Sequence, residues 1–234
     1  MASAQRDSLA HSLARAPVLA SLAVEDIAEL ARCAVRRDFE RGQLIFREGD
    51  MWPHALYLAS GWLRWTLTDR DGHRQMLLDV PPGNLVWGHS LFDGLPMPAD
   101  LEAREPSVTY RWDRTAVRAV LGSRLEAMWE LCGSLTRAMR RARELIFSFA
   151  FQSVAQRPAA LLLRWYPAQD GRSVRRELTL EEMAAYVGST PALVCKTLYG
   201  FADMGLLRIS RTEFEFLDRN GLKQIATSEP MSTL

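Results

Sequence analysis

The sequence of 234 residues predicts an α+β protein with a β-rich N-terminal domain (1–122), a long helix (123–151) and a C-terminal winged helix-turn-helix (152–234). Three observations predict this arrangement. Turn-forming pairs recur about every ten residues between residues 41 and 94, as in an antiparallel β sandwich or barrel. An apolar stripe with a heptad period follows. Capping residues then mark two short consecutive helices.

The composition excludes some classes of protein. The formal net charge is only +1, so contact with nucleic acid has to come from a local patch. No run approaches the roughly 18 apolar residues of a membrane helix, and the N-terminus lacks the regions of a secretory signal. We therefore expect a cytoplasmic protein without membrane contact.

The chain carries no pattern typical of an enzyme or a metal site. Its three cysteines, Cys33, Cys132 and Cys195, are odd in number and far apart, unlike a disulfide framework, a zinc site or a four-cysteine cluster. Its four histidines are scattered, and neither a Ser/His/Asp set nor a phosphate loop is present. We expect a protein that is not an enzyme.

The N-terminal part combines a helical segment with a β unit. Residues 1–40 have a helical pattern, with an apolar stripe between Val24 and Ala31. Within residues 41–114, the segments 61–67 and 108–112 alternate apolar and polar side chains, which is typical of half-buried strands. We expect one compact β unit here.

A long helix follows from about Ser123. Its apolar residues are spaced three and four apart in alternation, the a/d pattern of a helix that packs on another helix. They are Leu125, Met128, Cys132, Leu135, Met139, Ala142, Ile146 and Phe149. The alternative is an ordinary buried helix with a chance stripe. We favour a parallel homodimer, because the helix is long and joins two domains.

The last part has the local chemistry of a helix-turn-helix. Thr179 and Glu182 form a capping box that starts one helix, and Gly188 suits its left-handed end. Thr190 caps a second helix that has Pro191 at its first position. Two apolar segments around a turn at residues 211–212 then predict a β-hairpin wing.

Helix geometry sets which residues would face DNA. The N-terminus of the second helix presents free amides to a phosphate, and Lys196 could contact phosphate or guanine. On the wing, Arg208 and Arg211 are expected to reach the DNA backbone, or to be solvated surface charges. The candidate DNA-binding residues are Ser189, Thr190, Pro191, Ala192, Cys195, Lys196, Tyr199, Arg208 and Arg211.

Residues 41–50, 56–61 and 178–207 resemble the cyclic-AMP receptor protein/fumarate-nitrate reductase regulator (Crp/Fnr) family, and the resemblance covers nearly the whole chain. It implies a cyclic-nucleotide-binding-like β-roll (jelly-roll), a dimerisation helix and a DNA-binding domain. It also implies a small-molecule effector in the roll that repositions two recognition helices on a two-fold operator. An activator of this kind would also contact RNA polymerase.

The sequence departs from the family in the nucleotide-binding cassette and in the recognition helix. Where the nucleotide cassette has Gly-Glu and Arg-Ser-Ala, this chain has Gly88-His89 and Pro98-Ala99-Asp100. Because the Arg that holds the phosphate is absent, we expect an effector other than cyclic AMP. In the recognition helix, Pro191 and Ala192 replace the base-reading Arg and Glu, so the operator should differ from the family's common palindrome.

Several effectors remain open. His89 matches the histidine that binds haem in the carbon monoxide sensors of the family, whereas Trp87 stands where they carry a ligating cysteine. An apolar ligand among the aromatic residues, oxidation of Cys132 or Cys195, and an empty, constitutively competent roll are the alternatives. The candidate effector-pocket residues are Trp62, Trp65, Trp87, Gly88, His89, Ser90, Leu91 and Asp100.

A hypothesis of a different class competes with the DNA-binding regulator. The altered recognition helix could belong to a ligand-binding or protein-interaction module that no longer recognises DNA. A sequence-specific footprint separates the two hypotheses.

Overall fold

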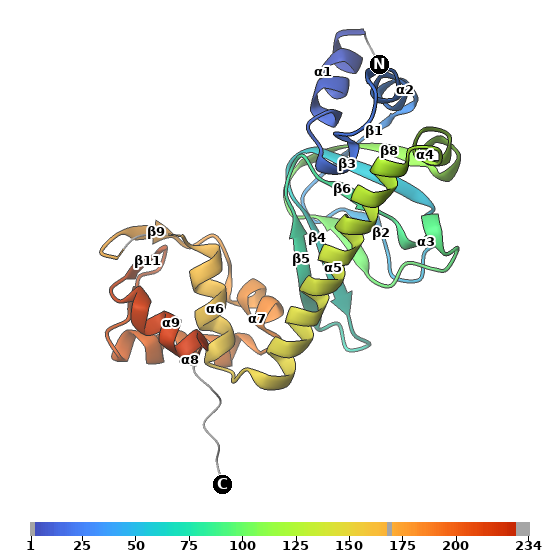
Figure 1. The fold of residues 1–234 in the computed structure, drawn as a ribbon. Helices are drawn as coiled ribbons and strands as arrows, with labels where there is room; N and C mark the ends of the chain where they lie inside the picture. Colours follow the sequence, from blue (N-terminus) through green and yellow to red (C-terminus); the bar gives the residue numbers. More distant parts are fainter. Residues whose placement is uncertain (1–2, 168–169, 228–234) are drawn as a thin grey trace. The chain divides into compact units, whose positions relative to one another are not determined.

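The computed structural model describes residues 3–167 and 170–227 (Figure 1). The chain forms two compact units, one containing most of residues 1–141 and the other residues 142–234. Within the described ranges, no helix is both long enough and apolar enough to span a bilayer.

The first unit contains two antiparallel sheets and several short helices. Its strand orders are β1-β8-β3-β6 and β2-β7-β4-β5. The helices are α1 (Ser3–Leu13), α2 (Val24–Cys33), α3 (His89–Phe92) and α4 (Arg114–Leu121), with a 3-10 turn at Pro17–Leu19. The strands are β1 (Val35–Phe39), β2 (Leu44–Phe46), β3 (His54–Ser60), β4 (Leu63–Thr68), β5 (Arg74–Val80), β6 (Leu85–Trp87), β7 (Asp100–Ala103) and β8 (Ser107–Asp113).

The interior of this β-roll is apolar. Leu58 of β3, Leu63 of β4 and Leu101 of β7 are fully buried in one core cluster. The expected strand at 61–67 is confirmed as β4, and Leu63 and Trp65 both join this core. Leu67, which the alternation places on the same face, is 38% exposed near the end of the strand.

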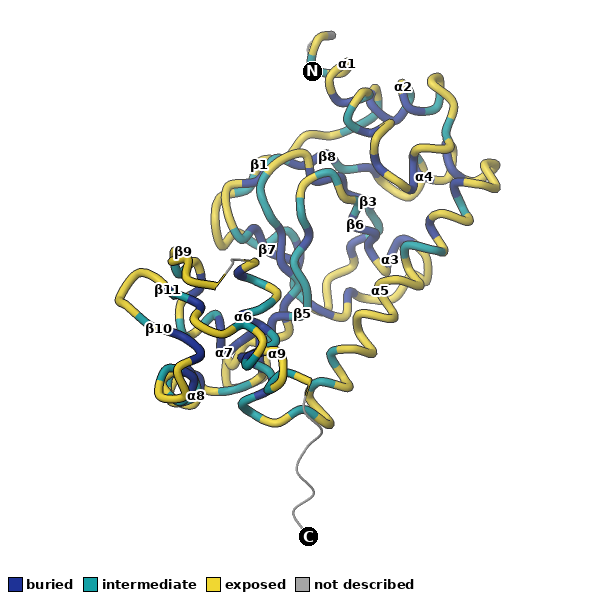
Figure 2. The backbone as a smooth tube through the Cα atoms, turned by 60° about the vertical axis from the view of Figure 1, so that its left-hand side comes forward, coloured by how far each residue is buried: buried dark blue, intermediate teal, exposed yellow. Residues whose placement is uncertain are grey.

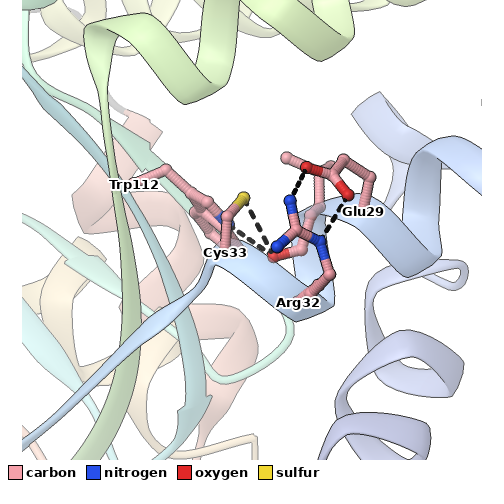
Figure 3. Close-up of polar contacts among 5 residues, drawn as sticks. Glu29, Arg32, Cys33 and Trp112 are labelled. Atoms are coloured by element: carbon pink, nitrogen blue, oxygen red, sulfur yellow. Dashed lines mark hydrogen bonds and ion pairs between the residues drawn. The ribbon is translucent and has the colours of Figure 1, made fainter.

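A second core lies between the β1-β8-β3-β6 sheet and the helices. It contains Trp87, Tyr110 and Trp112 together with apolar residues of α1, α2 and α4. The indole N–H of Trp112 donates to the carbonyl of Leu30 at 2.8 Å, which ties α2 to β8 (Figure 3). Burial raises the pKa of the Cys33 thiol beside this contact, which disfavours the nucleophilic thiolate.

Helix α5 (Leu125–Phe151) contributes to the second core through a face that the heptad did not predict. Ala127 and Leu131 are almost fully buried there. Just before α5, the guanidinium of Arg124 binds both carboxylate oxygens of Asp26 on α2, at 2.7 and 2.9 Å. This ion pair and the two apolar side chains anchor the start of α5 on its own domain.

The heptad residues lie on a different face of α5, and most are exposed in the single chain. Leu125 is 68% exposed, Met139 73% and Ile146 68%, while Met128 is half-buried. Figure 2 shows exposed residues along most of the helix. The hypothesis of an ordinary buried helix is therefore wrong for most of the stripe: Met128 packs against the second core, whereas the other stripe residues are exposed.

The second unit combines helices with a small sheet of order β10-β11-β9. Its elements are α6 (Gln156–Trp165), β9 (Ser173–Arg175), α7 (Leu180–Val187), α8 (Pro191–Asp203), β10 (Leu207–Ile209), β11 (Glu213–Phe216) and α9 (Arg219–Thr227). Strand β9 was not predicted; part of the polar segment before it, residues 168–169, lies outside the described residues. Phe201, Phe214 and Phe216 are fully buried in the core of this unit.

One histidine in the first unit is held in its neutral form. The Nδ1 atom of His54 is buried and makes no hydrogen bond within the described residues, and the ring packs edge-on against Trp52. Burial, and then the charge of Arg111, lower the pKa of His54. The unfolded chain therefore binds a proton more readily than the folded chain does.

We expect the free energy of unfolding to decrease as the pH falls below about 6.5, the ordinary pKa of histidine. The contribution of His54 is complete above that pH and is lost as the pH falls through the lowered pKa. Urea denaturation at about pH 7.5 and 5.5 measures this difference. His54→Gln should reduce the difference and His11→Gln, at an exposed position, should not. An unchanged difference in His54→Gln would contradict the assignment.

Candidate nucleic-acid interface and β-roll interior

The helix-turn-helix is built by local hydrogen bonds. Thr179 Oγ1 accepts the amide of Glu182 at 3.1 Å, and the Glu182 carboxylate accepts the amide of Thr179 at 3.0 Å. Gly188 ends α7 in the left-handed conformation, with φ of 59°. The predicted capping box and the predicted glycine are both confirmed. They fix the turn that leads into α8.

Helix α8 begins as predicted. Thr190 Oγ1 accepts the amide of Leu193 at 3.3 Å, and Pro191 occupies the first turn. Val194, Leu198 and Phe201 are buried at the spacing of one helical stripe. The apolar pattern of the sequence also predicts an inward Leu193. That prediction is wrong: Leu193 is 39% exposed, because it lies about 100° around the helix from Val194.

The outer face of α8 carries the other candidate residues. The candidate residues at the start of α8 and along its outer face are exposed, except for Ser189 and Cys195, which are half-buried. Lys196 is exposed and has no ion-pair partner in the described part of the chain. The exposed set is Thr190, Pro191, Ala192, Leu193, Lys196 and Tyr199.

The two wing arginines differ in their surroundings. Arg208 of β10 forms an ion pair with Glu215, the residue directly opposite it on β11. Arg211 lies exposed in the turn between these strands and has no ion-pair partner within the described ranges. A phosphate would compete with Glu215 for Arg208, whereas Arg211 is available without rearrangement.

Three aromatic rings pack together in the β-roll interior. The ring of Phe46 lies 4.6 Å from that of Trp52 and 5.4 Å from that of Trp65, measured between centroids. Phe46 and Trp52 are buried, and Trp65 is half-buried. We call Phe46, Trp52 and Trp65 the aromatic cluster. It places the chain's own side chains inside the roll.

The structure does not bring all the predicted effector-pocket residues together. Trp65 lies in the roll interior, whereas Trp87 and Leu91 belong to the second core, which contains the helices. Trp62 is half-buried, and the guanidinium of Arg104 lies 5.8 Å from its ring. Alternation along a strand does not tell which of two cores a face will join, so the aromatic residues could not be divided from the sequence.

The remaining pocket residues have structural partners. A Cβ on Gly88 would lie 2.5 Å from the carbonyl oxygen of Trp52, so the close approach requires glycine. Ser90 is fully buried and donates to the carbonyl of Leu95 at 2.6 Å. The carboxylate of Asp100 accepts the amide of Glu48 at 2.8 Å and the hydroxyl of Thr68 at 3.3 Å.

His89 does not lie in a site that suits haem. It is exposed at the start of α3, and its ring packs edge-on against Trp65 at 5.8 Å. A haem needs an iron ligand together with room for a planar macrocycle in an apolar pocket. The aromatic cluster occupies the neighbouring interior, so the residues present do not fit this cofactor.

Sequence reasoning missed a buried ion pair in the roll. Arg64 Nε lies 3.2 Å from the Asp79 carboxylate, and their side chains are only 4% and 12% exposed. Glu102 of β7 lies directly opposite Arg64 in the sheet and is also buried. The alternation of the segment 61–67 gives no indication that Arg64 has buried partners. Removing one partner of such a pair leaves an uncompensated buried charge, which destabilises the fold.

Comparisons with known proteins agree with this geometry. Residues 36–124 match the family described as "Cyclic nucleotide-binding domain", and residues 156–225 match the "Crp-like helix-turn-helix domain". A "CRP-like cAMP-activated global transcriptional regulator" of Mycobacterium tuberculosis is 29% identical over 202 residues, covering 84% of this chain and 90% of that protein. The "Cyclic AMP receptor protein" of Thermus thermophilus is 27% identical, with 90% and 96% covered.

Solved structures have the same fold. A transcriptional regulator of the CRP/FNR family from Thermus thermophilus aligns with a TM-score of 0.69 at 25% identity, covering 84% of this chain and all of that one. A regulator of the crp/fnr family from Eubacterium rectale aligns with a TM-score of 0.75 at 17% identity, covering 91% and 98%. With its cyclic-nucleotide-binding-type β-roll and its Crp-type helix-turn-helix, the chain belongs to the Crp/Fnr family of transcription regulators.

Proposed function

We propose that this regulator binds a two-fold DNA operator as a homodimer and that cyclic AMP is not its effector. The observation that carries the proposal of specific binding is the outer face of α8. It presents Lys196 and the first turn of the helix to solvent, while Val194, Leu198 and Phe201 hold the helix on its domain. Residues at the start of such a helix contact base edges in the major groove.

The exposed heptad of α5 supports a homodimer. We take residues 123–151 as the dimerisation part, between a sensor domain (1–122) and a DNA-binding domain (152–234). A soluble monomer would leave Leu125, Met139 and Ile146 in water, each more than half exposed. Pairing two such helices buries these side chains at an a/d seam. The dimer then presents two α8 helices to half-sites about 34 Å apart.

Two features argue against cyclic AMP, although relatives of this chain are named for it. The segment Pro98-Ala99-Asp100 contains no arginine to pair with a cyclic phosphate. The aromatic cluster occupies part of the roll interior. An effector of this protein would have to bind beside these rings or displace them, which favours an uncharged apolar molecule over a nucleotide.

Met139→Asp should convert the dimer into monomers, because it places two carboxylates opposite each other at a desolvated seam. The measurement is sedimentation equilibrium at several protein concentrations. Arg137→Asp is the matched control: it introduces the same side chain on the opposite side of the helix from the seam. A dimer in both variants would contradict the α5 interface.

Cyclic AMP at about 1 mM should cause no saturable change in tryptophan fluorescence. At that concentration, even a site with a binding free energy of only about −4 kcal/mol would be half occupied. The aromatic cluster contains Trp52 and Trp65, so a ligand inside the roll would report directly. The Mycobacterium tuberculosis relative serves as the positive control. Saturable binding at micromolar concentration would refute the proposal.

DNase I footprinting on the protein's own promoter region should reveal a two-fold protected site in the presence of competitor DNA. The salt concentration has to be fixed at about 0.1 M, because phosphate contacts make the affinity depend on salt. Lys196→Ala should weaken binding to all sequences and lower the salt slope by about 1 for each phosphate that the side chain no longer neutralises. Lys223→Ala, at an exposed position on α9, should leave binding unchanged. Binding that competitor DNA abolishes would contradict specific recognition.

A further inference from the structure

The first turn of α8 carries three consecutive apolar residues that face solvent. Pro191, Ala192 and Leu193 are all exposed, and Leu193 is 39% exposed despite its size. We call these three residues the apolar edge. The buried stripe of the helix is formed instead by Val194, Leu198 and Phe201.

The side chains of the apolar edge can neither donate nor accept a hydrogen bond. They therefore cannot make the bidentate contacts by which Arg recognises guanine or Asn recognises adenine. In the major groove, only one base carries an apolar group on its edge, which is thymine with its C5 methyl. An apolar side chain at this position on a recognition helix is complementary to that methyl group.

The neighbouring residues supply the charge that DNA binding needs. Lys196 follows the apolar edge by one turn and is exposed without an ion-pair partner in the described chain. A lysine there complements the phosphate backbone while the first turn faces the bases. Thr190 caps α8 through its hydroxyl oxygen, which holds that side chain at the helix start.

We propose that the apolar edge makes this regulator select operators with thymine in each half-site, through contact of Ala192 and Leu193 with C5 methyl groups. This inference rests on the proposed function, because it assumes that α8 enters the major groove. It makes Ala192 and Leu193 specificity-determining residues. Lys196 supplies affinity at the same surface.

The test replaces thymine by deoxyuridine, which removes the methyl group and keeps every hydrogen-bonding atom. A site is first selected from random DNA with the full-length protein, and each thymine is then replaced singly. At contacted thymines we expect binding about fourfold weaker, the factor that corresponds to about 0.8 kcal/mol for one buried CH₂ group. Replacing thymines between the half-sites should leave the affinity unchanged.

A pair of variants ties the effect to the apolar edge. Leu193→Ala should reduce the preference for thymine over uracil at one position of each half-site while the protein still binds. Met204→Ala, which shortens another exposed apolar side chain at the far end of α8, should leave the preference unchanged. Circular dichroism confirms that both variants are folded. An unchanged preference in Leu193→Ala would overturn the role of that residue.

The outcomes separate this inference from the proposed function. If no sequence is enriched in the selection, specific DNA binding fails and the thymine preference fails with it. If a two-fold site is enriched but every thymine can be replaced by deoxyuridine without loss of affinity, specific DNA binding is supported and methyl recognition is overturned. A loss on replacing guanine by 7-deazaguanine in that second case would identify a polar contact as the determinant.

Discussion

Helix α5 has two apolar faces that both have to be buried, and the organisation of the chain depends on that constraint. One face, with Ala127 and Leu131, completes the second core of the first unit. The other face carries the heptad, and all of its residues except Met128 are exposed. The ion pair between Arg124 and Asp26 fixes where the helix leaves its domain. The exposed face is thereby presented in one defined orientation for a second helix.

The helix-turn-helix could be predicted almost residue by residue, because its boundaries are set by local chemistry. The capping box at Thr179 and Glu182, the left-handed Gly188 and the cap at Thr190 each act over a few residues. A single sequence contains all of that information. The inward placement of Leu193 failed at the edge of the buried stripe, where a rotation of one residue changes the environment.

The roll and its candidate pocket could be predicted only in outline, because their decisive contacts join distant parts of the chain. The strands followed from turn spacing and alternation. Alternation gave no means to assign Trp87 to the second core and Trp65 to the roll interior. The burial of Arg64 beside Asp79 was hidden for the same reason: a polar strand face predicts solvent, and only the folded sheet reveals a buried partner.

The aromatic cluster also determines how the first domain obtains its stability. A domain that binds a metabolite gains RT ln(1 + [L]/Kd) of stability, so its folded population follows the concentration of that metabolite. Here Phe46, Trp52 and Trp65 supply the apolar contacts inside the roll from the chain itself. These contacts form when the chain folds, at any metabolite concentration. This part of the domain's stability is therefore independent of the concentration of any ligand.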